Sequence, residues 1–253
     1  MSCVSRTGTD GRERLNLDSE RVLAWDGCIN VRDLGGLETD DGRKTRFGVA
    51  IRADSIRGLT DEGWQALANY GVERAIDLRA DDEVAEDPPD AAPIPVVRVP
   101  ITPWELASLR EGWPSMREGY LALIEHFGPR FAEVIAEVGG ADGPVVIHCQ
   151  GGRDRTGLVV ALILQLVGVA PELIAADHAG SDASLAPKFD KWLSEAETEA
   201  ERERLRRIFE PAGRTMVGIL EEVDARYGGP RKYLLEAGAS PESIDRLVLR
   251  LRG

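Results

Sequence analysis

The sequence predicts an α/β protein with a central, mostly parallel sheet flanked by helices and a helical C-terminal part. Three observations support this class. Short and wholly apolar runs, of which Val145–Ile147 is the clearest, indicate buried strands. Helical segments alternate with these strands, a pattern typical of a parallel sheet covered on both faces. From Pro171 onward every segment has the pattern of a helix.

The N-terminal half begins with a polar segment and continues with strands. Residues 1–20 are rich in Gly, Ser, Thr and charge, which predicts a flexible arm before a single domain at 21–253. From Val22 to Ala53, short apolar pieces broken by glycines predict strands, with a hairpin turn at Asp41–Gly42. The next expected elements are a helix from a Thr60 cap to Gly71, a strand at Val72–Leu78, a loop at 87–95 and a strand at 96–101.

The C-terminal half is expected to be mainly helical. Residues 158–169, LVVALILQLVGV, are apolar nearly all round and predict a buried helix. The charge-dense segment Lys188–Arg207 predicts a solvated amphipathic helix. Other helices are expected at Met116–His126, at about Pro129–Glu137 and after the Ser240–Pro241 cap.

Charge and composition exclude several classes of protein. A net charge of −13 argues against a nucleic-acid partner and against stable insertion into a membrane. The three cysteines, Cys3, Cys28 and Cys149, show no CxxC spacing, which argues against a disulfide framework or structural zinc. The N-terminus has no signal-peptide pattern, and the longest apolar run, Leu158–Ala170, is too short to span a bilayer. We therefore expect a cytoplasmic protein.

The segment HCQGGRDRTG at 148–157 carries the predicted chemistry. It joins a buried strand to a buried helix that starts near Thr156, so its backbone N–H groups lie at a helix N-terminus, where the dipole is positive. Gly151 and Gly152 let the loop curl until successive amides converge on one anion. Cys149 facing this nest is expected to be a thiolate, the nucleophilic form.

Arg155 follows Cys149 by six residues, which lets its guanidinium fork return to the same anion. Thr156 is expected to offer its hydroxyl to the sulfur, and His148 to brace the loop backbone. The alternative, a structural cysteine beside a helix, leaves the arginine, the glycines and the threonine unexplained. The residues predicted to bind the substrate are Gln150, Gly151, Gly152, Arg153, Asp154 and Arg155.

This segment resembles the phosphate-binding loop of protein tyrosine phosphatases, in particular the bacterial tyrosine/serine phosphatases with the loop HCxxGKDRTG. Asn30–Gly36 (NVRDLGG) resembles that group's NxRDLGG, and Ile76–Arg79 with Glu83 resembles its DLR…E. The resemblance extends from about residue 22 to the C-terminus. It implies a tyrosine-phosphatase-like fold and hydrolysis of phosphate monoesters through a phosphocysteine, with no metal and no organic cofactor. Phosphotyrosine in proteins is the implied substrate, with phosphoserine and phosphothreonine as further candidates.

The sequence leaves the general acid open. Many tyrosine phosphatases carry it in a Trp-Pro-Asp loop, but this chain has Trp113–Ser115, WPS, and no aspartate between Val97 and Asp142. Asp154, inside the loop, is the favoured acid, and its alternative role is to brace Arg155 or Arg32. Asp77 is the second candidate, because active sites of α/β sheets lie at the carboxyl ends of strands. Its alternative role is to pair with Arg79 or Arg74.

Further residues are assigned supporting roles. Arg32 and Asp33 are expected to hydrogen-bond the loop from the side. Arg153, in place of the usual lysine, is expected to attract the anionic substrate or to be a solvent-exposed charge. His178 is expected on a helix face or in a lid, and the resemblance implies a lid role for the helix at Lys188–Arg207.

Three rival functions remain. The first is the same chemistry on a phospholipid, a phosphoinositide, although the chain lacks a polybasic patch. The second is a catalytically silent phosphate-binding module, which the presence of Cys149, Arg155 and Thr156 disfavours. The third is thiol-based redox transfer, for which no nearby cysteine could act as the resolving thiol. The oligomeric state is not determined by the sequence.

Overall fold

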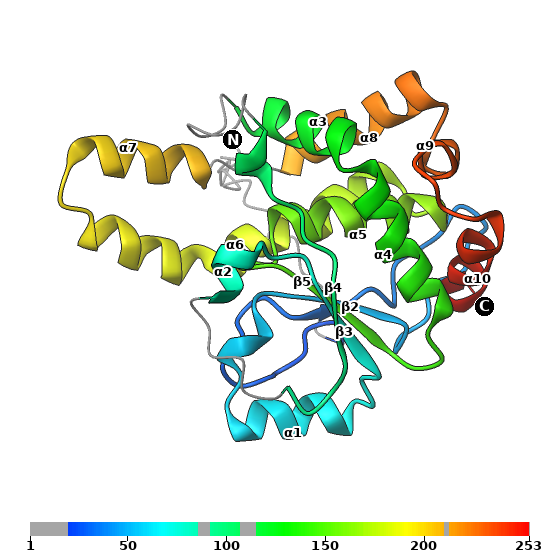
Figure 1. Cartoon of the computed structure of the whole chain (residues 1–253), viewed down its shortest axis with the longest axis horizontal. Coiled ribbons are helices and arrows are strands. Elements are labelled where there is room, and N and C mark those ends of the chain that lie inside the picture. Colours follow the sequence, from blue (N-terminus) through cyan, green and yellow to red (C-terminus); the bar gives the residue numbers. More distant parts are fainter. Residues whose placement is uncertain (1–19, 86–91, 107–114, 210–212, 253) are drawn as a thin grey trace, which may run out of the picture.

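The computed structural model describes residues 20–85, 92–106, 115–209 and 213–252 (Figure 1). The flexible arm expected at 1–20 lies outside the described residues apart from Glu20, and so do Trp113 and Pro114. Among the described residues, no helix combines the length and the apolar character that crossing a bilayer requires.

A single five-stranded sheet forms in the order β1-β2-β5-β3-β4. β1 pairs antiparallel with β2, and the remaining pairs are parallel, which confirms the predicted mostly parallel sheet. The strands are β1 (Arg32–Asp33), β2 (Ala50–Ala53), β3 (Arg74–Asp77), β4 (Val96–Arg98) and β5 (Val145–His148).

Helices cover both faces of the sheet (Figure 1). The helices in the described ranges are α1 (Asp61–Asn69), α2 (Asp81–Ala85), α3 (Met116–His126), α4 (Gly128–Gly140), α5 (Asp154–Leu166), α6 (Pro171–Glu195), α7 (Glu199–Ile208), α8 (Gly213–Tyr227), α9 (Pro230–Glu236) and α10 (Pro241–Arg252). Two short 3-10 helices, η1 (Ile56–Gly58) and η2 (Pro103–Glu105), lie in the connections.

Residues 145–147 of the central strand β5 are apolar because both faces of the strand are covered. Val145 and Ile147 pack into the larger core with α3, α4 and α5, whereas Val146 packs on the opposite face with Leu67 of α1. Successive side chains of a strand point to opposite faces, so helices on both sides favour apolar residues at successive positions. The predicted buried helix is α5, which begins at Asp154 rather than near Thr156.

Local capping follows the sequence closely. The Thr60 hydroxyl accepts a hydrogen bond from the Gly63 N–H at 3.2 Å, as predicted for the start of α1. Ser240 caps α10 in the same way, through the Ser243 N–H. Each cap satisfies a backbone donor that has no partner within its helix.

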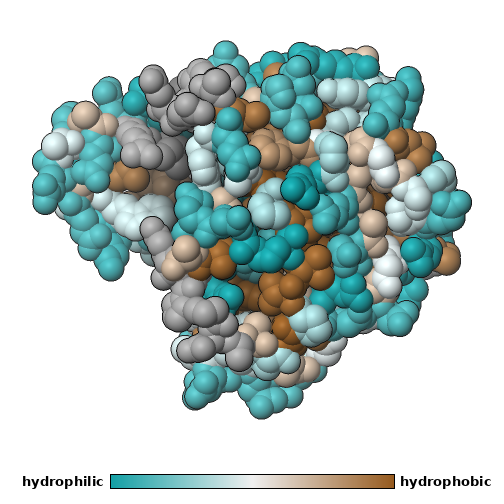
Figure 2. Space-filling model, in the orientation of Figure 1, coloured by the Kyte–Doolittle hydropathy of each residue, from teal (hydrophilic) through white to brown (hydrophobic). Residues whose placement is uncertain are grey.

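The segment Lys188–Arg207 differs from the single helix that the sequence predicted. It comprises the end of α6 and all of α7, because Thr198 caps a new helix by accepting from the Glu201 N–H. The two helices form a hairpin that projects from the sheet (Figure 1), and hydrophilic residues predominate on its visible face (Figure 2). The ring of Phe209 stacks on Phe189 with centroids 4.4 Å apart.

Candidate active site

The HCQGGRDRTG segment lies where β5 ends and α5 begins, at the carboxyl edge of the parallel strands. This edge is where α/β sheets place their binding sites, because the loops and helix N-termini converge there. Cys149 directly follows β5 and is buried, with 3% of its surface exposed.

Three successive carbonyl groups of the loop are held by the surrounding scaffold. The Gly152 carbonyl accepts from Arg52 Nη2 at 2.8 Å, and the Gly151 carbonyl accepts from Asn30 Nδ2 at 2.9 Å. The Gln150 carbonyl accepts from the Ser55 N–H at 3.2 Å. In a trans peptide the N–H points away from the C=O, so anchoring these carbonyls turns the following amides towards the inside of the loop.

The conformation of the loop at position 152 requires a glycine. Its φ is +65°, and a Cβ there would lie 2.3 Å from the carbonyl oxygen of Ala53 at the end of β2. Any side chain would push the loop away from the strand that supports it. The glycine therefore permits the curl that the sequence predicted.

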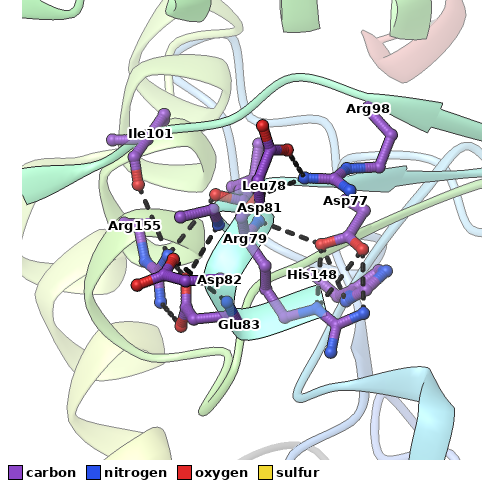
Figure 3. Close-up of polar contacts among 11 residues, drawn as sticks. Asp77, Leu78, Arg79, Asp81, Asp82, Glu83, Arg98, Ile101, His148 and Arg155 are labelled. Carbon is purple, nitrogen blue, oxygen red and sulfur yellow. Dashed lines mark hydrogen bonds and ion pairs between the residues drawn. The ribbon is translucent and has the colours of Figure 1, made fainter. Parts of the chain in front are cut away.

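Arg155 is held by a bidentate ion pair with Glu83 of α2 (Figure 3). Its Nη1 donates to Glu83 Oε2 at 2.6 Å, and its Nη2 to Oε1 at 2.7 Å. A guanidinium has five N–H groups, so this pair leaves the Nε side unengaged among the described residues. The Trp104 ring lies 5.8 Å from the guanidinium carbon, within the range of a cation–π contact.

Arg155 and Glu83 each stabilise the charged form of the other, although both are largely buried. Burial alone would lower the pKa of Arg155, but its hydrogen bonds to Glu83 and the charge of that carboxylate raise it above its usual value. Burial would likewise raise the pKa of Glu83, but Arg155 holds it below its usual range. The site thus keeps a fixed positive group in place beside the loop.

Asp77 lies in the ion pair with Arg79 that the sequence left as its alternative role (Figure 3). Its Oδ1 and Oδ2 accept from Arg79 Nε and Nη2 at 3.0 and 2.9 Å, and both side chains are buried. Burial would raise the pKa of Asp77, but Arg79, with His148 beside it, leaves it lowered. This environment favours the charged carboxylate of Asp77 over its protonated form. Arg74 pairs with Glu73 and Glu137 instead.

Asp154 has a different environment. Its Oδ1 accepts a hydrogen bond from the Tyr120 hydroxyl at 2.7 Å and lies 3.4 Å from Arg153 Nη1. Its Oδ2 makes no hydrogen bond with the described residues, and 30% of its side-chain surface is exposed. The alternative role predicted for Asp154, a brace for Arg155 or Arg32, is not observed as a hydrogen bond or ion pair among the described residues.

Arg153 is not the solvent-exposed charge that was one of its two predicted roles, and its attraction of the substrate stays a prediction. Its side chain is only 2% exposed and pairs with Asp182 of α6, with Nε 2.6 Å from Oδ1. The Phe209 ring lies 5.6 Å from its guanidinium carbon. Arg153 thus ties the loop to α6 and to the end of the projecting hairpin.

The supporting residues also differ from their predicted contacts. Arg32 contacts the loop indirectly, through Asn30, whose Oδ1 accepts from Arg32 Nη1 at 2.6 Å, and through Ser181, which also accepts from Arg52. Asp33 does not contact the loop: it accepts from the Gly35 and Gly48 N–H groups and from the Tyr70 hydroxyl. The prediction that both residues hydrogen-bond the loop directly is therefore wrong.

Two buried groups of the loop have no hydrogen-bond partner among the residues that the structure describes. Neither ring nitrogen of His148 makes a hydrogen bond, so the predicted bracing by this side chain is not observed. Burial lowers the pKa of His148 to about 4, which keeps the imidazole neutral. The Thr156 hydroxyl is buried without a partner, and its predicted hydrogen bond to the sulfur stays a prediction.

Helix α6 supplies a second tier of contacts that sequence reasoning missed. Asp177 accepts from Arg52 Nη1 and from Arg21 Nη2, each at 2.6 Å. Arg52 is the same residue that holds the Gly152 carbonyl. Burial would raise the pKa of Asp177, but Arg32, Arg52 and Arg21 hold it far below its usual range.

A signal for this tier is present in the sequence. The segment AADHAGSDAS places Asp177 and His178 one helical turn before Ser181 and Asp182, so the four polar residues share one face of α6. The Ser181 hydroxyl accepts from both Arg32 Nη2 and Arg52 Nη2. Polar residues on a face otherwise lined by small residues indicate a buried polar contact rather than a solvated face.

No group of three or more His, Cys, Asp or Glu residues in the described ranges is arranged to hold a metal ion. Positive charge at this site comes from arginines and from the N-terminus of α5.

Comparison with known proteins gives a consistent result. The chain is 32% identical to a tyrosine-protein phosphatase of Nostoc commune over 224 residues, 79% of this chain and 73% of that protein. It is 26% identical to the triple specificity protein phosphatase PtpB of Mycobacterium tuberculosis over 267 residues, 87% of this chain and 95% of that protein. The crystal structure of P. aeruginosa TpbA has 17% identity and a TM-score of 0.36, covering 62% of this chain and 86% of that one, a likeness too distant to bear on function. Residues 23–253 match the tyrosine phosphatase family as a whole, and the chain belongs to that family.

Proposed function

We propose that this chain is a cysteine-dependent phosphatase that hydrolyses phosphate monoesters through a phosphocysteine at Cys149. The observation that carries the proposal is the anchored loop at the β5–α5 junction. Its carbonyls are anchored outwards, its cysteine lies at the base, and Arg155 is fixed beside it by Glu83.

The chemistry begins with in-line attack of Cys149 Sγ on phosphorus. The P–S bond forms as the bond to the leaving oxygen breaks, and Asp154 gives its proton to that oxygen. Loop amides of 150–155 and the Nε side of Arg155 hold the three equatorial oxygens. Water then attacks the phosphocysteine, Asp154 takes its proton, and Thr156 donates a hydrogen bond to the departing sulfur.

Phosphotyrosine in proteins is the proposed substrate, because the family and the Nostoc commune relative are named for it. Phosphoserine, phosphothreonine and phosphoinositides remain alternatives, and the name of the PtpB relative indicates that more than one specificity occurs among similar chains. A matched panel of phosphopeptides and phosphoinositides, compared by kcat/KM, identifies the substrate class.

The proposal is tested with the purified chain and p-nitrophenyl phosphate. Turnover is expected to survive chelation by EDTA, since the nest itself supplies the positive charge. Cys149→Ser is expected to lose several powers of ten in kcat while vanadate still binds, because the amides and Arg155 remain. Arg155→Lys is expected to weaken both binding and turnover, because lysine lacks the fork. EDTA-sensitive turnover restored by a divalent ion, or a Cys149→Ser enzyme with more than about 1% activity, contradicts the proposal.

A further inference from the structure

A chain of hydrogen bonds from two distant helices ends on Asp154. Tyr120 of α3 donates its hydroxyl proton to Asp154 Oδ1 at 2.7 Å, and its oxygen lies 3.0 Å from His178 Nε2 of α6. The two rings meet edge to face, with centroids 5.8 Å apart and planes at 86°. Both side chains are buried, so their orientations are set by packing as well as by hydrogen bonding.

The direction of the chain follows from proton counting. Tyr120 has one hydroxyl proton and donates it to Asp154, so its oxygen must accept from His178. Burial, followed by the charges of Arg52 and Arg153, lowers the pKa of His178 well below its usual value, and the ring is neutral. A neutral imidazole has one N–H, which is therefore on Nε2 and absent from Nδ1.

The other side of the imidazole is consistent with this tautomer. His178 Nδ1 is buried and has no hydrogen-bond partner among the described residues, so no acceptor there would stabilise a proton on Nδ1. It lies against α5 at Gly157, where an added Cβ would be 2.5 Å from Nδ1. Gly157 thus gives the ring the room it needs to face Tyr120.

We propose that Tyr120 and His178 are positioning residues that fix the Asp154 carboxyl for proton transfer. The inference rests on the proposed role of Asp154 as the general acid. With Oδ1 held by Tyr120, the transferable proton is carried on Oδ2, the oxygen without a partner among the described residues. Tyr120 keeps its own proton throughout, because burial, followed by the charge of Asp154, raises its pKa well above the usual value.

The arrangement serves both chemical steps. In the first, Oδ2–H gives its proton to the leaving oxygen as the P–O bond breaks and the P–S bond forms. In the second, the carboxylate takes a proton from the attacking water on the same oxygen. The ionisable groups around Asp154 and its hydrogen-bond chain come from every element packed against them: Arg153 and Arg155 on the loop and α5, Tyr120 on α3, Asp177, His178 and Asp182 on α6, and Arg32 and Arg52 on β1 and β2.

Tyr120→Phe tests the proposal, because it removes only the hydroxyl. We expect kcat on phenyl phosphate to fall about tenfold. This is less than the full loss of a general acid, because the Asp154 carboxyl remains and loses only one hydrogen bond. On p-nitrophenyl phosphate, whose leaving group hardly needs a proton, kcat is expected to fall less than about threefold. KM and vanadate affinity are expected to be unchanged, and the basic limb of the kcat profile to move or flatten.

Tyr233→Phe is the matched control. It removes a buried hydroxyl that donates to the Ile124 carbonyl, away from the loop. Its melting temperature reports the general effect of losing a buried tyrosine hydroxyl, and its leaving-group dependence is expected to be that of the parent. His178→Gln keeps an amide donor near Tyr120 and is expected to retain more activity on phenyl phosphate than His178→Leu.

A double variant separates this inference from the proposed function. In the Asp154→Asn background, Tyr120→Phe is expected to add no further loss on phenyl phosphate, because the two residues act as one unit. If Asp154→Asn lowers kcat more on phenyl phosphate than on p-nitrophenyl phosphate and Tyr120→Phe does not, the positioning role is wrong and the acid assignment stands. If Asp154→Asn lowers kcat equally on both substrates, the acid assignment itself is wrong. Equal loss on both substrates in a folded Tyr120→Phe enzyme also overturns the positioning role.

Discussion

The two aspartates considered as the general acid have surroundings that separate their roles. Asp77 is buried between Arg79 and His148 and makes the ion pair that shapes the end of β3. Asp154 has one oxygen held by Tyr120 and the other without a hydrogen bond to the described residues, and its side chain is partly exposed. In the sequence, Asp77 ends a predicted strand and Asp154 precedes a predicted helix, and nothing else separates the two carboxylates. Their hydrogen-bond partners in the structure distinguish an anchored anion from a group that can exchange a proton.

Asp77→Asn is expected to destabilise the fold rather than change the chemistry. It removes one partner of the buried ion pair with Arg79, and breaking such pairs costs about 3–5 kcal/mol. The free energy of unfolding is expected to fall by an amount of that order, with kcat on phenyl and p-nitrophenyl phosphate lowered to the same extent. Asp154→Asn, whose side chain is partly exposed, is the comparison and is expected to fold normally. A selective loss on phenyl phosphate in Asp77→Asn, with none in Asp154→Asn, would reverse the assignment.

At the scale of single residues, the sequence predicts what depends on local chain geometry. Cys149 and Arg155 belong to one loop, so their spacing and the two glycines define a nest without further information. Arg153 was misplaced because its partner, Asp182, comes from a helix that the sequence does not position. His178 was assigned to a lid or a helix face for the same reason: Tyr120, its partner, is 58 residues away.

At the scale of elements, α6 is the helix that fixes the loop from behind. Asp177 holds Arg52, which holds the Gly152 carbonyl, so the helix and the loop share one buried network. Arg32 and Ser181 complete the network on the β1 side. The orientation of the loop amides therefore depends on a residue that does not belong to the loop.

Asp177→Asn is expected to loosen the loop and to lower activity equally on substrates with good and poor leaving groups. Arg52 and Arg21 would lose their buried counter-charge, so the free energy of unfolding should fall by about 3–5 kcal/mol. Vanadate affinity and kcat/KM are expected to fall by similar factors on all substrates. Asp245→Asn, which breaks an exposed pair with Arg231, is the control and should change little. Full vanadate affinity in a folded Asp177→Asn enzyme would show that the loop does not depend on α6.

Helix existence was predicted better than helix continuity. The caps at Thr60 and Ser240 are local, and both helices begin where the sequence indicates. The expected single helix at Lys188–Arg207 is two, because Thr198 is a capping residue within a charged segment whose periodicity continues on both sides. Periodicity alone does not show where such a segment turns back on itself.

At the scale of the whole molecule, a chain of net charge −13 concentrates buried arginines around one loop. Two neutral, buried histidines share this region, His148 and His178, and both have lowered pKa values. Their protonation is opposed by burial and, for His178, by the arginines. The same groups that prepare the site for an anion thus make the fold sensitive to acid.

Stability is therefore expected to fall as the pH falls below about 6.5, the pKa of histidine in an unfolded chain. Below that pH the unfolded chain takes up protons that the folded chain does not. For His148 this continues to about pH 4. Each histidine contributes a slope approaching about 1.4 kcal/mol per pH unit. Urea unfolding between pH 7.5 and 5 measures the slope, which should be shallower in His178→Gln. An unchanged slope in that variant would show that His178 does not remain neutral in the fold.

The most direct test of the whole account is to trap the covalent intermediate. The full chain is mixed with phenyl or p-nitrophenyl phosphate, denatured rapidly at alkaline pH during turnover, and digested for peptide mass spectrometry. We predict one phosphate on the peptide that contains Cys149, as a thiophosphate ester, and none in Cys149→Ser. Thr156→Ala is expected to increase its steady-state amount, since the departing sulfur loses a hydrogen-bond donor. Sustained turnover with no phosphate on Cys149, or with phosphate on another residue, would contradict the account.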